Sequence, residues 1–252
     1  MFNPFTLENK TIIITGASSG IGRQCAIDCS RMGANVILIA RNKERLQETL
    51  SLMEVGNHNY YCYDLSDLEG IRSLVSNIIS DNGKINGFIH AAGIELTKPT
   101  KLLEPLDYNR IFDVNSVSAF ELVRNLSSVK NMEQNSSIVL ISSITSIIGR
   151  TGVAAYAASK GAMNSATKVF ALELVKRKIR VNCILPGTII TPLIQNYLSS
   201  LNEEDYKKRI DGFPLGLGET TDISNACIYL LSDASRWVTG QNIIIDGGYT
   251  IR

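Results

Sequence analysis

Two side chains in the middle of this sequence could share one piece of proton chemistry. Tyr156 and Lys160 are four residues apart, so in a helix both lie on one face, about one turn apart. The run from Val153 to Val175 is rich in Ala and has no proline, which favours a helix. A nearby ammonium favours the phenolate and lowers the pKa of the phenol from its usual value of about 10. The pair could therefore supply a proton, although a surface Tyr stacked on a Lys stem has the same spacing.

A glycine-rich turn near the start of the chain suggests a phosphate site. Thr11 to Ile14 is apolar and β-branched, as in a strand buried on both faces, and a helical pattern runs to Arg31 after the turn. Glycines let the backbone approach a ligand, and a helix N-terminus offers free N–H groups to an anion. A turn that binds nothing remains the alternative. The residues expected to contact phosphate are Gly16, Ser18, Ser19, Gly20, Ile21 and Gly22.

The end of the second predicted strand, Asn35 to Ala40, indicates which dinucleotide would bind. In a dinucleotide site an acidic residue near this point suits the free ribose of NAD, whereas a basic residue suits the phosphate of NADP. The residue here is Arg41, followed by Asn42 and Lys43, and none of these three residues is acidic. We therefore expect NADP(H) to be favoured over NAD(H), unless Arg41 and Lys43 only solvate a loop.

Other candidate residues follow further predicted strands or lie in a helix. Asp64 follows the third strand, where adenine would lie, and Ala91 to Gly93 follow the fourth, where small residues permit close packing. His90 is expected to bond to backbone as a strand-end histidine, with a catalytic base as the alternative. Asn115 lies on the apolar side of a helical pattern from Asp107 to Lys130, so it marks either a helix distortion or a functional site.

Strand and helix alternate along the whole sequence, which predicts an α/β fold. We expect a single-domain doubly wound Rossmann fold over residues 1–252, with a seven-stranded parallel sheet flanked by helices on both faces. Ligands bind at the carboxyl ends of the strands in such folds, so one crevice should collect every feature above. The segment from Ile189 to Leu217 would form a substrate lid, with Leu193, Ile194, Tyr197, Leu198 and Phe213 as apolar positions.

Composition excludes several other classes of protein. The 252 residues are 44% hydrophobic, and the net charge of +1 gives no reason to expect nucleic acid as a partner. We see no signal peptide and no membrane span, and therefore expect a cytoplasmic protein without a membrane partner. Without CxxC pairs or His clusters no metal site is expected, and the thiols should be reduced and mostly buried. The cysteines are Cys25, Cys29, Cys62, Cys183 and Cys227.

Taken together and in this order, the motifs resemble the short-chain dehydrogenase/reductase family across essentially the whole chain. His90 is a departure, because the family usually has Asn before its Ala-Gly; that position shapes the pocket and does not donate the proton. The matching segments are TGASSGIG (15–22), Asp64, AAG (91–93), Asn115, Ser143, YAASK (156–160) and PG (186–187).

The resemblance implies a role for each matching residue. Tyr156 would protonate the carbonyl oxygen as hydride arrives, and Ser143 would hydrogen-bond that oxygen. Lys160 would lower the pKa of Tyr156 and hold the ribose hydroxyls, and Asn115 would hold a water that links Lys160 to solvent. The implied cofactor-binding residues are Gly16, Ser18, Ser19, Gly20, Ile21, Gly22, Arg41, Asp64, Leu65, Ala91, Ala92, Gly93, Asn115, Tyr156, Lys160, Pro186, Gly187, Thr188, Ile189 and Thr191.

The closest general likeness within the family is to the 3-oxoacyl-[acyl-carrier-protein] reductases of fatty acid biosynthesis. An NADP(H)-dependent carbonyl reductase acting on a small molecule or an acyl thioester is the leading expectation, with Lys176, Arg177 and Lys178 as candidate carrier contacts beside the cleft. The alternatives are an alcohol, sugar or steroid dehydrogenase and a non-catalytic dinucleotide-binding protein. The resemblance also implies a homotetramer.

Overall fold

The chain folds around a seven-stranded sheet in which all neighbouring strands are parallel. The computed structural model describes residues 3–199 and 201–252. The strand order is β3-β2-β1-β4-β5-β6-β9, so the direction of winding reverses between β1 and β4. This order confirms the predicted doubly wound Rossmann fold. The strands are β1 (Thr11–Thr15), β2 (Asn35–Ala40), β3 (Asn59–Cys62), β4 (Ile85–His90), β5 (Met132–Ile141), β6 (Arg180–Pro186) and β9 (Asn242–Ile245).

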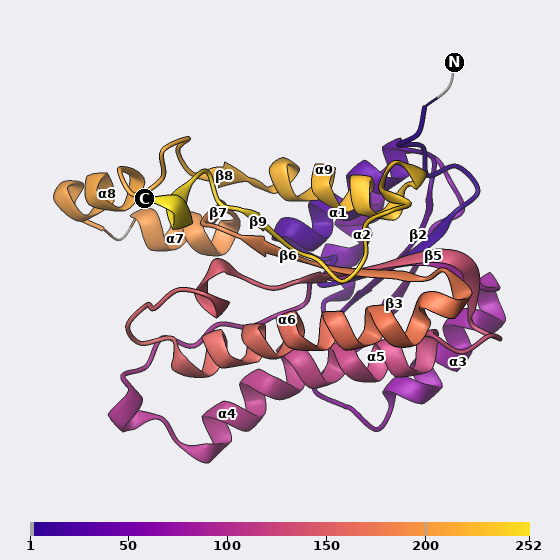
Figure 1. The fold of residues 1–252 in the computed structure, drawn as a ribbon, viewed down its shortest axis with the longest axis horizontal. Helices are drawn as coiled ribbons and strands as arrows, with labels where there is room; N and C mark the ends of the chain where they lie inside the picture. The colour runs from indigo at the N-terminus through magenta and orange to yellow at the C-terminus, as the bar shows by residue number, and fades with distance from the viewer. Residues whose placement is uncertain (1–2, 200) are drawn as a thin grey trace.

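Helices cover both faces of the sheet because its central strands are apolar on both sides. Ile13 packs into the core formed with α3, α5 and α6, whereas Ile12 and Ile14 pack into the core formed with α1, α2 and α9. Figure 1 shows these two layers on opposite sides of the sheet. The helices are α1 (Gly20–Arg31), α2 (Lys43–Ser51), α3 (Ile71–Asn82), α4 (Pro105–Phe112), α5 (Ser118–Leu126), α6 (Ala154–Leu174), α7 (Pro192–Ser199), α8 (Glu203–Ile210) and α9 (Thr220–Leu231).

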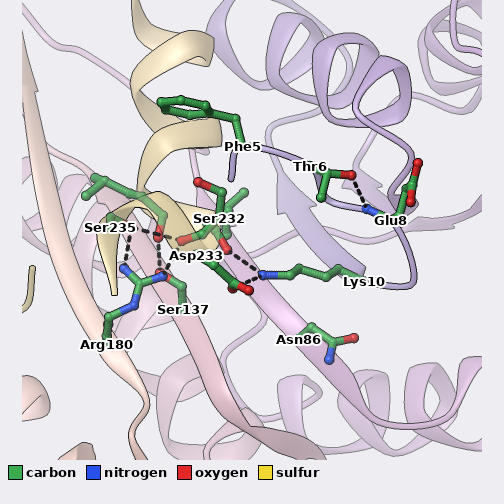
Figure 2. A network of polar contacts seen from close by, with 12 residues as sticks. Phe5, Thr6, Glu8, Lys10, Asn86, Ser137, Arg180, Ser232, Asp233 and Ser235 are labelled. Carbon is green, nitrogen blue, oxygen red and sulfur yellow. Dashed lines mark hydrogen bonds and ion pairs between the residues drawn. The ribbon is translucent and has the colours of Figure 1, made fainter. Parts of the chain in front are cut away.

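Polar contacts tie the amino ends of the strands together (Figure 2). The buried Arg180, the first residue of β6, donates from Nη1 to Ser235 Oγ at 2.7 Å and from Nη2 to the Ser232 carbonyl at 3.1 Å. Lys10, just before β1, forms an ion pair with Asp233 at 2.8 Å. These groups are engaged in holding the segment after α9 against the sheet, at the opposite end from the carboxyl ends of the strands.

The long helix predicted from Asp107 to Lys130 is interrupted in the structure. α4 ends at Phe112, one π-helical turn spans Asp113–Val117, and α5 begins at Ser118. Asn115 lies at the centre of this turn and is fully buried. The amide therefore does mark a helix distortion, and such turns are frequent at functional sites.

An aspartate stabilises the turn before α3, which begins at Ile71. Asp67 accepts a hydrogen bond from the Gly70 N–H at 3.1 Å in this turn. The side chain stabilises that turn because a short carboxylate can bond backbone two or three residues further on.

The segment between β6 and α9 forms a structure of its own beyond the sheet. The two-residue strands β7 (Ile189–Ile190) and β8 (Gly218–Glu219) pair in parallel, and α7 and α8 lie between them in sequence. Figure 1 shows α7 and α8 at one end of the molecule, near the C-terminus. Residue 200 and the side chains of Leu193 and Tyr197, which belong to the predicted lid, lie outside the described part. No helix in residues 3–199 and 201–252 is long and apolar enough to cross a membrane.

Candidate active site

Two adjoining cavities open at the carboxyl ends of the strands. The inner pocket has a volume of about 220 Å³ and the outer cleft one of about 1000 Å³. They share five lining residues, which are Ile21, Ala91, Gly93, Ile94 and Thr191. Ser143, Tyr156 and Lys160 line the inner pocket, and the glycine-rich turn lines the outer cleft. Every other predicted site residue lines one or both cavities, except Asn115.

The lysine of the central pair is buried beneath the inner pocket. Lys160 lies on α6, and its Nζ is 5.7 Å from the ring centroid of Tyr156 and donates to the Ile141 carbonyl at 2.8 Å. Burial lowers the pKa of Lys160 to about 8. Gly93 leaves the space beside this ammonium open, since a Cβ there would lie 3.3 Å from Nζ. A ligand in the shared part of the cavities could therefore reach the lysine.

The pKa of the tyrosine differs from the sequence-based expectation. Burial raises the pKa of Tyr156 to about 12, and the negative charge of Glu95 adds to this rise. A hydrogen bond with Ser143 and the charge of Arg150 act in the opposite direction. Lys160 is not among the groups that shift this pKa, and its ammonium donates to the Ile141 carbonyl. Tyr156 is thus held as a protonated phenol, which is the form that can donate a proton.

The hydroxyl of Ser143 has its proton available for the pocket. Ser143 follows β5 and caps a short 3₁₀ turn, where its Oγ accepts from the Thr145 N–H at 3.2 Å and from Thr145 Oγ1 at 2.9 Å. Because both contacts use the serine oxygen as acceptor, its own O–H can point to Tyr156 or to a ligand oxygen. Ser143 and Tyr156 therefore present two O–H donors to one place.

Asn115 is buried and does not line either cavity. Its Oδ1 accepts from the Ile94 N–H at 2.8 Å, and its Nδ2 donates to the Ile94 carbonyl at 3.0 Å and to Ser159 Oγ at 3.0 Å. Ser159 lies between Tyr156 and Lys160 on α6. The π-helical turn thus fixes the segment after β4 against α6 through one buried amide. The water that the resemblance assigns to Asn115 stays a prediction.

The glycine-rich turn has the shape that a pyrophosphate needs. Gly16 has φ +67°, and a Cβ there would lie 2.8 Å from the Ala92 nitrogen. A Cβ on Gly22 would lie 2.4 Å from the Gly16 carbonyl oxygen. Ser19 makes no side-chain cap at the start of α1, and the first turn of α1 has no acidic residue. The first N–H groups of α1 therefore remain suited to an anionic ligand, as a nicotinamide dinucleotide would provide.

The structure corrects one premise of the cofactor argument. None of the residues from Arg41 to Lys43 is acidic, but Asp64 lies 3.8 Å from the guanidinium of Arg41. Asp64 also accepts from the N–H and hydroxyl of Ser66, and these bonds help to lower the pKa of its carboxyl. Two further arginines, Arg23 and Arg45, line the outer cleft and were missed by the sequence reasoning. Both lie on helices behind the strand ends, and helical spacing alone does not say which side faces the ligand.

The sequence reasoning also missed charged residues of the inner pocket. Glu95, Arg150 and Arg209 line it together with Tyr249 from the C-terminal segment. Arg150 and Glu95 form an ion pair at 3.4 Å. These residues lie outside the motifs, in loops and in α8, so only the folded arrangement brings them together. Pockets built this way carry specificity on loops positioned by a rigid sheet.

Comparisons with known proteins give the class to which this fold and site belong. A family model described as enoyl-(acyl carrier protein) reductase matches residues 16–250. A 3-oxoacyl-[acyl-carrier-protein] reductase from Thermotoga maritima is 33% identical over 97% of this chain and 99% of its own length. A glucose 1-dehydrogenase from Gluconobacter oxydans is 30% identical over 96% and 92%. A crystal structure of a dehydrogenase from Agrobacterium tumefaciens with bound NADP is 28% identical, covers 100% of both chains and superposes with a TM-score of 0.89.

The chain belongs to the short-chain dehydrogenase/reductase family. It is therefore an oxidoreductase that depends on a nicotinamide dinucleotide.

Proposed function

We propose that this enzyme interconverts a carbonyl compound and an alcohol, with the two O–H donors of Ser143 and Tyr156 acting on the substrate oxygen. The observation that carries the proposal is their common position at the inner pocket, which shares five lining residues with the outer cleft. Hydride transfer to a carbonyl carbon leaves negative charge on its oxygen, which needs a donor and a proton at one point.

The side chains divide this work between them. The dinucleotide, when bound, supplies or takes up the hydride. Ser143 donates a hydrogen bond to the substrate oxygen, and Tyr156 transfers its phenolic proton there. When the dinucleotide is bound, Lys160 would hold its ribose hydroxyls, and the lysine charge would lower the pKa of Tyr156. Asn115 positions Ile94 and α6, and a water at the π-helical turn carries protons from solvent to Lys160.

A spectroscopic assay tests this function directly. Purified enzyme is mixed with NADPH and a panel of β-ketoacyl thioesters, simple ketones and sugar-derived ketones, and loss of the reduced nicotinamide absorbance is followed. We expect turnover of at least one compound and loss of that turnover in Ser143→Ala. The proposal is contradicted if none of the carbonyl compounds increases the rate of NADPH oxidation above the rate without substrate.

NADP(H) is the proposed cofactor. Arg41, Arg45 and Arg23 gather at the outer cleft beside the end of β2, and Arg23 also donates to the Ser18 carbonyl at 2.8 Å. Asp64 neutralises part of the charge of Arg41, and Glu48 pairs with Arg23 at 2.9 Å. With three arginines facing two acids, the surplus positive charge suits a ribose phosphate better than a free ribose hydroxyl. The relative with bound NADP supports the same choice.

We propose that the substrate is a small carbonyl compound. A 3-oxoacyl chain on a carrier protein is the second candidate. The basic residues expected beside the cleft, Lys176 to Lys178, follow the C-terminal end of α6 and precede β6, at the opposite end of the sheet. Arg177 donates to the carbonyls of Ser127 and Met132 and so caps neighbouring elements. These three residues of one chain therefore do not provide a basic surface beside the site to which an acidic carrier protein could bind.

The remaining parts of the proposal concern the lid, the assembly and the compartment. We propose that α7 and α8 close over the inner pocket, which Phe213 and Arg209 already line. A homotetramer would cover two exposed apolar surfaces, Val169 and Leu172 on α6 and Trp237 beside the edge strand β9. Sedimentation as a monomer at micromolar concentration would contradict that assembly. The five free cysteines suit the reducing cytoplasm, where we place the enzyme.

A further inference from the structure

One arginine of the inner pocket has no acidic partner. Arg209 lies at the end of α8, after the exposed Lys207 and Lys208, and turns inward. Its Nη2 donates to Thr188 Oγ1 at 2.8 Å, and its guanidinium carbon lies 5.9 Å from the ring centroid of Phe213. Within residues 3–199 and 201–252 no carboxylate lies within ion-pair distance of Arg209, and its Nε is buried without a hydrogen-bond partner.

The charges around the pocket do not balance. The side chains that line it include Arg150, Lys160 and Arg209 as bases and Glu95 as an acid, and Glu95 is paired with Arg150. Lys160 already has the Ile141 carbonyl and a role in the reaction. Arg209 is the base that the pocket leaves free, among the residues that the structure describes. A partly buried charge without a counter-charge is unfavourable, so an anion that enters the pocket beside Arg209 would relieve that cost.

We propose that Arg209 binds an anionic group of the substrate, so that the enzyme acts on a small oxo acid and its hydroxy acid. This rests on the proposed carbonyl–alcohol chemistry. The planar guanidinium matches a carboxylate in a two-point hydrogen bond. Phe213 lies beside it and excludes water, which strengthens such a pair. At 220 Å³ the pocket is smaller than most ligand pockets, so the acid is compact.

The reaction balances without any further reactant. Hydride from the reduced nicotinamide forms a C–H bond at the carbonyl carbon while the C=O π bond breaks. Tyr156 gives its proton to the oxygen and is reprotonated from solvent, and the products are the hydroxy acid and the oxidised dinucleotide. The carboxylate on Arg209 keeps its charge throughout and serves only to fix the carbonyl between Ser143 and Tyr156.

A phosphate of the dinucleotide is the other possible source of an anion. The position of Arg209 favours the substrate, because this residue lines the inner pocket and is not among the residues that line the outer cleft with the glycine-rich turn. Measurements on cofactor and substrate separately distinguish the two sources. A third reading, in which Arg209 only holds the lid down through Thr188, also makes a different prediction, since a lid contact would serve charged and uncharged substrates alike.

The experiment compares 2-, 3- and 4-oxo acids with their methyl esters, using NADPH and the full chain. We expect kcat/KM to be at least about tenfold higher for the best acid than for its ester. Arg209→Gln should lower that acid-to-ester ratio towards one, mainly through KM. Lys208→Gln, which removes the same charge from the exposed side of α8, should leave the ratio unchanged.

Each other outcome has a definite meaning. Equal use of acids and esters by the wild type, or an unchanged ratio in Arg209→Gln, overturns the proposal. A higher Kd for NADPH in Arg209→Gln with no change in the ratio assigns the guanidinium to the cofactor and also overturns it. If no compound is turned over, the proposed function fails. The role of Arg209 is then tested by binding: the oxo acids should raise the Tm of the NADPH-bound protein, and Arg209→Gln should abolish that rise. No rise in the wild type, or an equal rise in the variant, overturns the proposal for Arg209.

Discussion

His90 Nδ1 and Thr15 Oγ1 lie 3.1 Å apart, within hydrogen-bond distance, at the carboxyl ends of β4 and β1. Thr15 Oγ1 already accepts from the N–H groups of Ala91 and Ala92 at 3.2 Å each, so its proton is left for the imidazole. From this network we assign the proton of the neutral ring to Nε2. The contact ties the strand before the glycine-rich turn to the segment that both cavities share.

The buried histidine should make the protein sensitive to acid. Burial lowers the pKa of His90 from 6.5 to about 3, with the charge of Lys160 acting in the same direction. Below pH 6.5 the unfolded chain therefore binds a proton that the folded chain does not, and stability falls as the pH falls. Between pH 7 and about pH 5 the free energy of unfolding should drop by about 2 kcal/mol. Urea unfolding at both pH values measures this drop.

His90→Asn is the matched variant for this prediction. Asn is what the family usually has at this position, and it cannot titrate. The variant should lose most of the drop between pH 7 and pH 5, whatever its stability at neutral pH. An equal drop in the variant would show that another group is responsible. His58→Asn, at the half-buried second histidine of the sequence, measures separately whether that residue contributes to the drop.

The glycine-rich turn should not tolerate a side chain at Gly16. Ala there would have φ +67° and a Cβ 2.8 Å from the Ala92 nitrogen, so either β1 or the segment after β4 must move. We expect Gly16→Ala to lose about 1–3 kcal/mol of stability and most of its affinity for NADPH. Gly149→Ala is the control, because nothing lies within 4 Å of its Cβ. Calorimetry and fluorescence titration measure the two effects, and NADPH binding of Gly16→Ala at wild-type strength would contradict the argument.

The fold and the motif residues could be predicted from the sequence because both depend on local patterns. Runs such as Val36 to Ala40 are apolar throughout, and glycines such as Gly16 and Gly22 precede or open a helix. For the π-helical turn at Asn115, the sequence indicated only that a polar amide lies on the apolar side of a helix. It could not indicate that the amide bonds to Ile94. Arg209 could not be predicted, because nothing in α8 indicates which base turns inward. Likewise only the fold brings Asp64 to Arg41.

Tyr156→Phe should abolish turnover and leave cofactor binding intact. The phenol is the proton donor in the proposed mechanism, and the ring of Phe fills the same space without the O–H. Loss of a general acid lowers kcat by about 10²–10⁴. The Kd for NADPH should stay within about threefold of the wild type. Tyr108→Phe, on an exposed position of α4, is the control and should keep full activity. Near wild-type kcat in Tyr156→Phe would falsify the assignment of the acid.

Cofactor preference should depend on Arg41. The substitution Arg41→Asp removes a positive charge at the end of β2 and places a second carboxylate next to that of Asp64. Binding of the extra phosphate of NADPH should weaken, while NADH, which carries a free ribose hydroxyl, gains a hydrogen-bond acceptor. We expect the ratio of kcat/KM for NADPH over NADH to fall at least about tenfold in Arg41→Asp.

A neighbouring lysine provides the control for the cofactor prediction. Lys43→Asp is a charge change of the same size, but this residue does not line the outer cleft. The ratio of kcat/KM for the two cofactors should therefore stay near that of the wild type in Lys43→Asp. Equal use of both cofactors by the wild type would remove the basis of the argument.

The last prediction concerns what the buried lysine costs the fold. Burial lowers the pKa of Lys160 from 10.5 to about 8, so at pH 7 the folded chain holds an ammonium that is disfavoured by roughly 3 kcal/mol relative to the unfolded chain. Lys160→Met removes that charge and fills similar space, although it leaves the Ile141 carbonyl without its donor at a cost of about 1 kcal/mol. We therefore expect the variant to be inactive and yet more stable than the wild type by about 2 kcal/mol at pH 7.

The dependence of this gain on pH is the decisive part. Between pH 8 and pH 10.5 the unfolded chain keeps the lysine proton while the folded chain releases it, so wild-type stability rises relative to the variant as the pH rises. The advantage of Lys160→Met should therefore shrink above pH 8 and be largely gone near pH 10. Urea unfolding of both proteins at pH 7 and about pH 9.5 measures the two differences. If the gain in stability is the same at both pH values, packing and not the buried charge causes the difference between the two proteins. If Lys160→Met is less stable than the wild type at pH 7, the fold accommodates the ammonium without a net cost.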